Sequence, residues 1–138
     1  MQETPLRPAE DAPHRVYIET YGCQMNVADS EVVASIVGMA GYTATDDIDR
    51  ADAVLLNTCS IRDNAEQKIM HRLEALRALR RRRHGHLIIG VIGCMAERTG
   101  RDLIDNHGVD IVAGPDSYMD LPALLEGAAA GHTGANVT

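Results

Sequence analysis

The chain has 138 residues, and its 20 acidic and 13 basic residues give a formal net charge of −7. That balance argues against a free-standing nucleic-acid-binding domain, which is normally basic, and a hydrophobic content of 45% argues against disorder. The longest apolar run, residues 87–96, is about half as long as a transmembrane helix. Residues 1–14 mix acids and prolines, which predicts a disordered tail rather than a signal peptide. We expect a soluble cytoplasmic domain without a membrane partner.

The first half of the chain contains three short apolar runs and one segment whose apolar residues have helical spacing. A β-branched run at 15–20 predicts the first strand. Asn26 can cap a helix that Gly41 ends. Residues 42–45 predict a short edge strand, and residues 53–57 predict a buried strand. The apolar positions of the helix follow helical spacing: Val32, Val33, Ile36 and Ala40.

The second half begins with the longest predicted helix. It starts at Asp63, three residues before Glu66, in an arrangement that resembles a capping box, and Gly85 ends it. Residues 87–92 then predict a strand that is buried on both faces. The apolar face of the long helix comprises Ala65, Ile69, Leu73, Leu76 and Leu79. Three elements complete the pattern: a helix over 97–106, a strand over 109–113 and a helix from Pro122 to about residue 130.

This alternation of strands and helices is typical of βαβ units, so we predict an α/β fold with a mostly parallel sheet of four or five strands. Numbered in chain order, the strands of a doubly wound sheet of this size commonly lie in the order 2-1-3-4-5. Residues 15–130 would form the domain. Residues 131–138 lack periodicity and are predicted to be a linker toward a further segment.

Each of the three cysteines closely follows a predicted strand. Cys23, Cys59 and Cys94 are therefore expected on loops at the carboxyl ends of strands 1, 3 and 4, about one βα unit apart. In the order 2-1-3-4-5 these strands are neighbours about 4.8 Å apart. A single free cysteine is more often a small buried core residue. Three at one edge of a sheet instead favour a shared site.

Iron–sulfur chemistry fits three separated thiols better than zinc does. A structural zinc site needs four ligands, usually including close cysteine pairs, and no C-x₂-C pair occurs here. A cubane cluster that is held by three thiolates leaves one iron open to an outside ligand. Gly22 and Gly93 would allow the backbone to approach such a bulky group.

Six short motifs carry a family resemblance. They are TYGCQMN at 20–26, ADSE at 28–31, NTCSIR at 57–62, AEQK at 65–68, GCMAE at 93–97 and VDIVAGP at 109–115. In this order they resemble the N-terminal domain of the radical-SAM methylthiotransferases, and the resemblance covers about residues 15 to 127. The first and third motifs are most similar to the branch that acts on N6-isopentenyladenosine in tRNA.

The resemblance implies a flavodoxin-like three-layer sandwich. It also implies that Cys23, Cys59 and Cys94 bind an auxiliary [4Fe–4S] cluster, whose open iron carries the sulfur inserted as a methylthio group at C2 of N6-isopentenyladenosine, next to the anticodon. Family members use S-adenosylmethionine and a second cluster in a radical-SAM domain in cis, followed by an RNA-binding domain. The C-x₃-C-x₂-C motif of that second cluster is absent here. We therefore expect this chain to be part of an enzyme and to be inactive alone, with tRNA bound mainly by another domain. We also expect it to be a monomer.

Polar residues beside the cysteines are candidates for hydrogen bonds to cluster sulfurs. They are Gln24, Asn26, Asn57 and Arg62; Asn26 has an equally good interpretation as a helix cap. The basic residues at the end of the long helix have two interpretations, contact with tRNA phosphates or a solvated cluster that complements the helix dipole. They are Arg77, Arg80, Arg81, Arg82, Arg83 and His84.

Other functions remain open from the residues alone. A flavin site would need a phosphate cradle rich in Ser, Thr and Gly after the first strand, and the sequence there is ETYGCQMN. A phosphocysteine carrier would use Cys23 but not the other two cysteines. A structural or interaction domain with buried free cysteines would use none of them.

Overall fold

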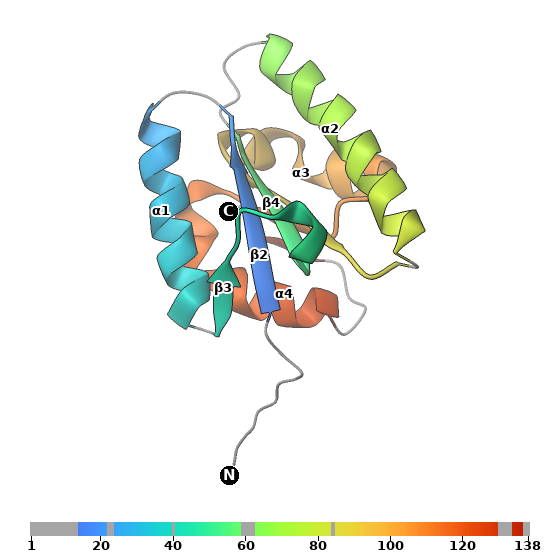
Figure 1. Ribbon diagram of the computed structural model, residues 1–138. Coiled ribbons are helices and arrows are strands. Elements are labelled where there is room, and N and C mark those ends of the chain that lie inside the picture. The colour runs from blue at the N-terminus through green and yellow to red at the C-terminus, as the bar shows by residue number, and fades with distance from the viewer. Residues whose placement is uncertain are drawn as a thin grey trace.

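The computed structural model describes residues 14–21, 24–39, 41–58, 63–83, 85–129 and 134–136. They form a six-stranded sheet in the order β3-β2-β4-β5-β6-β7, and every neighbouring pair is parallel. Helices cover both faces of this sheet (Figure 1).

The strands are β2 (His14–Thr20), β3 (Tyr42–Ala44), β4 (Ala53–Thr58), β5 (Ile88–Gly93), β6 (Ile111–Ala113) and β7 (Gly134–Asn136). The helices are α1 (Gln24–Met39), α2 (Asp63–Arg82), α3 (Cys94–His107) and α4 (Leu121–Ala129). Two short 3-10 helices, η1 (Ile48–Arg50) and η2 (Pro115–Asp120), precede β4 and α4.

The predicted α/β class and strand order are confirmed, because the first five strands lie in the order 2-1-3-4-5 when they are numbered along the chain. The number of strands was predicted too low. Residues 134–136, within the segment predicted as a linker, pair with β6 as a sixth strand. Three residues are too few to show an alternating pattern, and Gly and Asn are weak strand formers.

Two hydrophobic cores lie on the two faces of the sheet, and β4 contributes to both because successive side chains of a strand alternate between faces. Val54 and Leu56 pack in the core that α2 and α3 cover. Ala53 and Leu55 pack in the core that α1 and α4 cover. All six residues of β4 are buried, as expected for the middle of a parallel sheet.

Most of the described residues on the predicted helix faces are buried, Leu79 is partly buried, and the side chains of Ala40 and Ala65 lie outside the described residues. Ile69, Leu73 and Leu76 of α2 are buried. In α1 the buried stripe is Val33, Ile36 and Val37, whereas Val32 is 52% exposed. The prediction for Val32 was wrong because successive residues of a helix lie about 100° apart, which places it beside the stripe rather than within it.

Candidate functional site

The carboxyl ends of β2, β4 and β5 lie side by side at one edge of the sheet. Thr20 pairs with Asn57, and Thr58 pairs with Gly93. The three strands that precede the cysteines are thus adjacent and parallel, as predicted. Cys23, Cys59 and Arg62 themselves lie outside the described residues, as does Gly22. Gln24 and Asn26 lie in the first turn of α1, and the described residues exclude their side chains.

Cys94 is the first residue of α3, although the sequence predicted a loop here and a helix starting near residue 97. The strand passes into the helix without an intervening residue. Gly93 makes this possible with a backbone φ of 102°, a conformation that residues with a Cβ rarely adopt. The Cys94 side chain lies outside the described part of the structure, so only its backbone is placed.

The neighbouring strand β4 leaves no space for a side chain at position 93. A Cβ atom at this position would lie 2.3 Å from the carbonyl oxygen of Thr58 and 3.1 Å from Oδ1 of Asn57. From the sequence, this glycine is expected to allow the close approach of a cofactor. The structure gives it a different role, since the close approach is to the backbone of β4.

Asn57 is fully buried and connects β4 to α1 by a side-chain hydrogen bond. Its Nδ2 donates a hydrogen bond to Ser30 Oγ at 2.8 Å. Ser30 Oγ also lies 2.7 Å from Thr20 Oγ1, so one hydroxyl connects α1 to both β2 and β4. Asn57 is a site residue predicted from the sequence, whereas Ser30 and Thr20 were not predicted. Their signal was available, because both are polar positions within the TYGCQMN and ADSE motifs.

A second hydrogen-bond network, which was not predicted from the sequence, lies on the other face of β2. Arg72 of α2 donates to both carboxylate oxygens of Glu19, from Nε at 3.0 Å and from Nη2 at 2.5 Å. The hydroxyl of Tyr21 donates to Oε1 of the same carboxylate at 2.6 Å. Burial and this hydrogen bond to Glu19 raise the pKa of Tyr21 far above its usual value, so the hydroxyl remains a donor at neutral pH.

The basic end of α2 divides into inward and outward residues. Arg80 donates to Asp110 Oδ2 at 2.8 Å and to the carbonyl oxygen of Gly108 at 2.9 Å. Arg83 donates to the carbonyl oxygen of Ala51 at 2.8 Å. Arg81 and Arg82 are exposed. Neither sequence interpretation included the internal contacts of Arg80 and Arg83.

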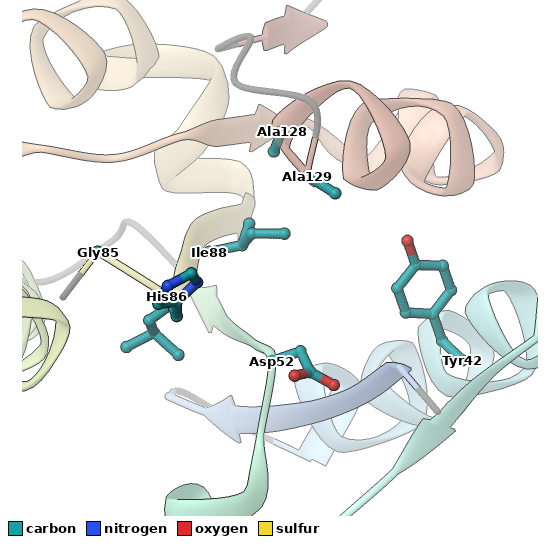
Figure 2. A pocket seen from close by; sticks show the side chains of 8 residues that line it. Tyr42, Asp52, Gly85, His86, Ile88, Ala128 and Ala129 are labelled. Atoms are coloured by element: carbon teal, nitrogen blue, oxygen red, sulfur yellow. The ribbon is translucent and has the colours of Figure 1, made fainter. Parts of the chain in front are cut away.

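A cavity of about 240 Å³ lies at the opposite, amino-terminal edge of the sheet. Figure 2 shows Asp52 and Tyr42 on one side of this space, with Ala128 and Ala129 across from them. None of the site residues predicted from the sequence lines it. The lining residues are Tyr42, Asp52, Gly85, His86, Leu87, Ile88, Ala128 and Ala129.

Within the described ranges, no three His, Cys, Asp or Glu side chains are arranged to hold a metal ion. Those ranges do not include Cys23, Cys59 or the side chain of Cys94. The same ranges contain no helix that is both long and apolar enough to cross a membrane.

The fold and its strand order define a flavodoxin-like α/β domain. Residues 15–114 match the model of a family described as "Uncharacterized protein family UPF0004", and the chain belongs to this family. The predicted resemblance to the N-terminal domain of the methylthiotransferases is thereby confirmed.

Curated relatives carry a more specific name, tRNA-2-methylthio-N(6)-dimethylallyladenosine synthase. The protein of that name from Porphyromonas gingivalis is 59% identical over 125 residues, which are 89% of this chain and 27% of the relative. One from Bacteroides fragilis is 56% identical over 127 residues, which are 92% of this chain and 28% of the relative. The chain thus spans about a quarter of the length of these relatives.

Proposed function

We propose that this chain is the cluster-binding part of a tRNA methylthiotransferase, in which Cys23, Cys59 and Cys94 hold an auxiliary [4Fe–4S] cluster. The observation that carries the proposal is the register between Thr58 and Gly93. Cys59 and Cys94 are the next residues in the sequence after this pair. The corresponding positions on neighbouring parallel strands are about 4.8 Å apart.

The third strand of the proposed site supports the same placement. β2 pairs with β4 on the side away from β5, and Thr20 at its end is opposite Asn57. Cys23 follows Thr20 by three residues in the sequence. Open α/β sheets bind their ligands beyond the carboxyl ends of their strands, where the strand order reverses. In this sheet the reversal lies between β2 and β4.

The chemistry of the edge also favours a thiolate-bound cluster. The oxygen-bearing side chains described there have partners within the protein: Glu19 accepts from Arg72, Asn57 donates to Ser30, and Thr58 Oγ1 donates to the carbonyl oxygen of Ile92 at 2.9 Å. Three cysteine thiolates suit iron–sulfur clusters and would leave one iron of a cubane open. When bound, the cluster would carry the transferred sulfur on its open iron.

For the substrate we propose N6-isopentenyladenosine in tRNA, methylthiolated at C2. The printed name of the relatives describes such a synthase, and the TYGCQMN and NTCSIR motifs resemble the same branch. S-adenosylmethionine and a second [4Fe–4S] cluster would act through a radical-SAM domain in cis. Because these 138 residues contain no C-x₃-C-x₂-C motif, we expect them to bind the auxiliary cluster without turning over tRNA.

Anaerobic reconstitution with iron and sulfide tests the cluster proposal. We expect about four irons per chain and the broad visible absorption of an iron–sulfur cluster. Cys23→Ser, Cys59→Ser and Cys94→Ser should each lower bound iron severalfold. Met39→Ala is the control, because Met39 is 75% exposed on α1 and also carries sulfur. Wild-type iron content in all three serine variants would overturn the proposal, and a flavin spectrum in the purified chain would favour the alternative flavin site.

A further inference from the structure

We propose that Arg72 is a positioning residue that fixes the point at which the chain leaves β2, two residues before Cys23 in the sequence. It does so through Glu19 and Tyr21, and we call these three residues the β2 clamp. This inference rests on the proposed function, since the position of Tyr21 matters for chemistry only if Cys23 is a ligand.

The β2 clamp joins the end of β2 to the neighbouring helix. Arg72 lies in the middle of α2 and makes a two-point contact with the carboxylate of Glu19. Tyr21, the first residue after β2, donates its hydroxyl to the same carboxylate. A planar guanidinium that contacts both carboxylate oxygens fixes direction as well as distance, which a single ion pair does not.

The clamp is more enclosed than an ordinary surface ion pair. The Glu19 side chain is 14% exposed and the Arg72 side chain 31% exposed. The ring of Tyr21 packs against the core beneath α2. Partial burial reduces solvent screening, yet the desolvation of both charges offsets much of the gain in stability. The role of the Glu19–Arg72 pair is therefore better explained as fixing one conformation of the chain than as adding stability.

The opposite face of β2 is fixed as well. Thr20 contacts Ser30 of α1, and Ser30 accepts from Asn57. The backbone N–H of Tyr21 donates to the carbonyl oxygen of Asn57 at 2.8 Å, which extends the pairing of β2 with β4 by one residue. At Tyr21, where the chain leaves the sheet, hydrogen bonds to α1, α2 and β4 therefore fix residues 19–21. Arg72 supplies the contact from α2.

Two measurements on the chain test the clamp: hydrogen exchange of the Tyr21 amide in the iron-free state, and the rate at which reconstituted chain loses iron to a chelator. Arg72→Ala should raise both rates about tenfold, because charge-assisted hydrogen bonds contribute on this scale. Arg72→Lys keeps the charge but not the two-point contact and should recover part of the loss. Arg82→Ala, an exposed arginine on the same helix, is the matched control. The Leu55 amide in the middle of β4 serves as the internal reference.

Faster exchange at Tyr21 without a change at Leu55, together with faster iron loss, supports the clamp. Equal acceleration at both amides indicates general destabilisation and overturns it. Wild-type rates in Arg72→Ala overturn it as well. A wild-type chain that takes up no iron overturns the proposed function, whereas equal iron retention in wild type and Arg72→Ala overturns only the clamp.

Discussion

Gly93 occupies a backbone conformation and a space that both exclude a side chain. Its φ is 102°, and an added Cβ would lie 2.3 Å from the carbonyl oxygen of Thr58. We expect Gly93→Ala to lower the free energy of unfolding by at least about 2 kcal/mol, from backbone strain and displacement of β4. Urea denaturation measures this effect.

The control for this substitution is Gly38→Ala. Gly38 lies inside α1, and a Cβ there would meet nothing within 4 Å. Because alanine is the better helix former, we expect a gain of up to about 1 kcal/mol. A Gly93→Ala chain as stable as wild type would contradict the proposed strand-to-helix geometry.

Tyr21 gives the stability of the chain a defined pH dependence. Its pKa is raised above 10.0 in the folded state, first by burial and then by the hydrogen bond to Glu19. The folded state therefore favours the neutral phenol, so this contribution is fully present below pH 10 and is lost as the pH rises through the raised folded pKa. Between about pH 10 and about pH 12, the free energy of unfolding should fall more steeply for wild type than for Tyr21→Phe. Parallel curves for the two chains would contradict this assignment.

At the scale of elements, the end of α2 is attached to the sheet by Arg80. Its guanidinium contacts Asp110 and Gly108, and Asp110 Oδ2 also accepts from the backbone N–H of Ile89 at 2.9 Å. Arg80→Ala should lower the free energy of unfolding by about 1–3 kcal/mol, because it removes hydrogen bonds that include a charged pair. Arg81→Ala, which changes an exposed neighbour, should stay within about 0.5 kcal/mol. Equal effects of the two substitutions would show that the Arg80 contacts contribute little.

The sequence predicted elements well where a long apolar pattern repeats. It predicted them poorly where a single residue determines the start of an element or the contacts of a side chain. The apolar spacing of α2 located Ile69, Leu73 and Leu76 in the core. The start of α3 at Cys94 depends on the backbone of Gly93, which no periodic pattern encodes. The four consecutive arginines at 80–83 look equivalent in the sequence. Their division into inward and outward pairs depends on the positions of Asp110 and Ala51 in the fold.

At the scale of the whole molecule, the order of the strands was predictable by analogy with other doubly wound sheets of this size. The positions of the cysteines after three of the strands then indicated the edge that these strands share. The hydrogen-bond networks at that edge were not predictable. Ser30 is ten residues from Thr20 and 27 from Asn57, and Arg72 is 53 residues from Glu19. Such contacts form only once the sheet has brought distant segments together, so they leave little signal in a local pattern.

The closeness of the strand ends at this edge predicts the oxidation state of the cysteines in chain that is purified in air without iron. Neighbouring strands about 5 Å apart fall within the range of Cα separations that a disulfide tolerates. We expect one disulfide, either Cys23–Cys59 or Cys59–Cys94, with the third thiol free. Thiol counts on unfolded chain should rise from one to three after reduction. Three free thiols before reduction, with no iron bound, would argue against cysteines close enough to share a cluster.

The position of β2 inside the sheet has a consequence for how the chain folds. β2 lies between β3 and β4, and the pairings of β2 with β4 and of β4 with β5 each join residues roughly 35 positions apart. Every pair of neighbouring strands among the described residues is parallel, so none of these pairs is a local hairpin. The entropy of closing long loops therefore opposes folding until the strands have paired. Refolding should accordingly be slower than for a helical bundle of similar size. During synthesis on a ribosome, β3 and then β4 would emerge as partners for β2, whereas the pairing of β4 with β5 could form only after about 35 further residues.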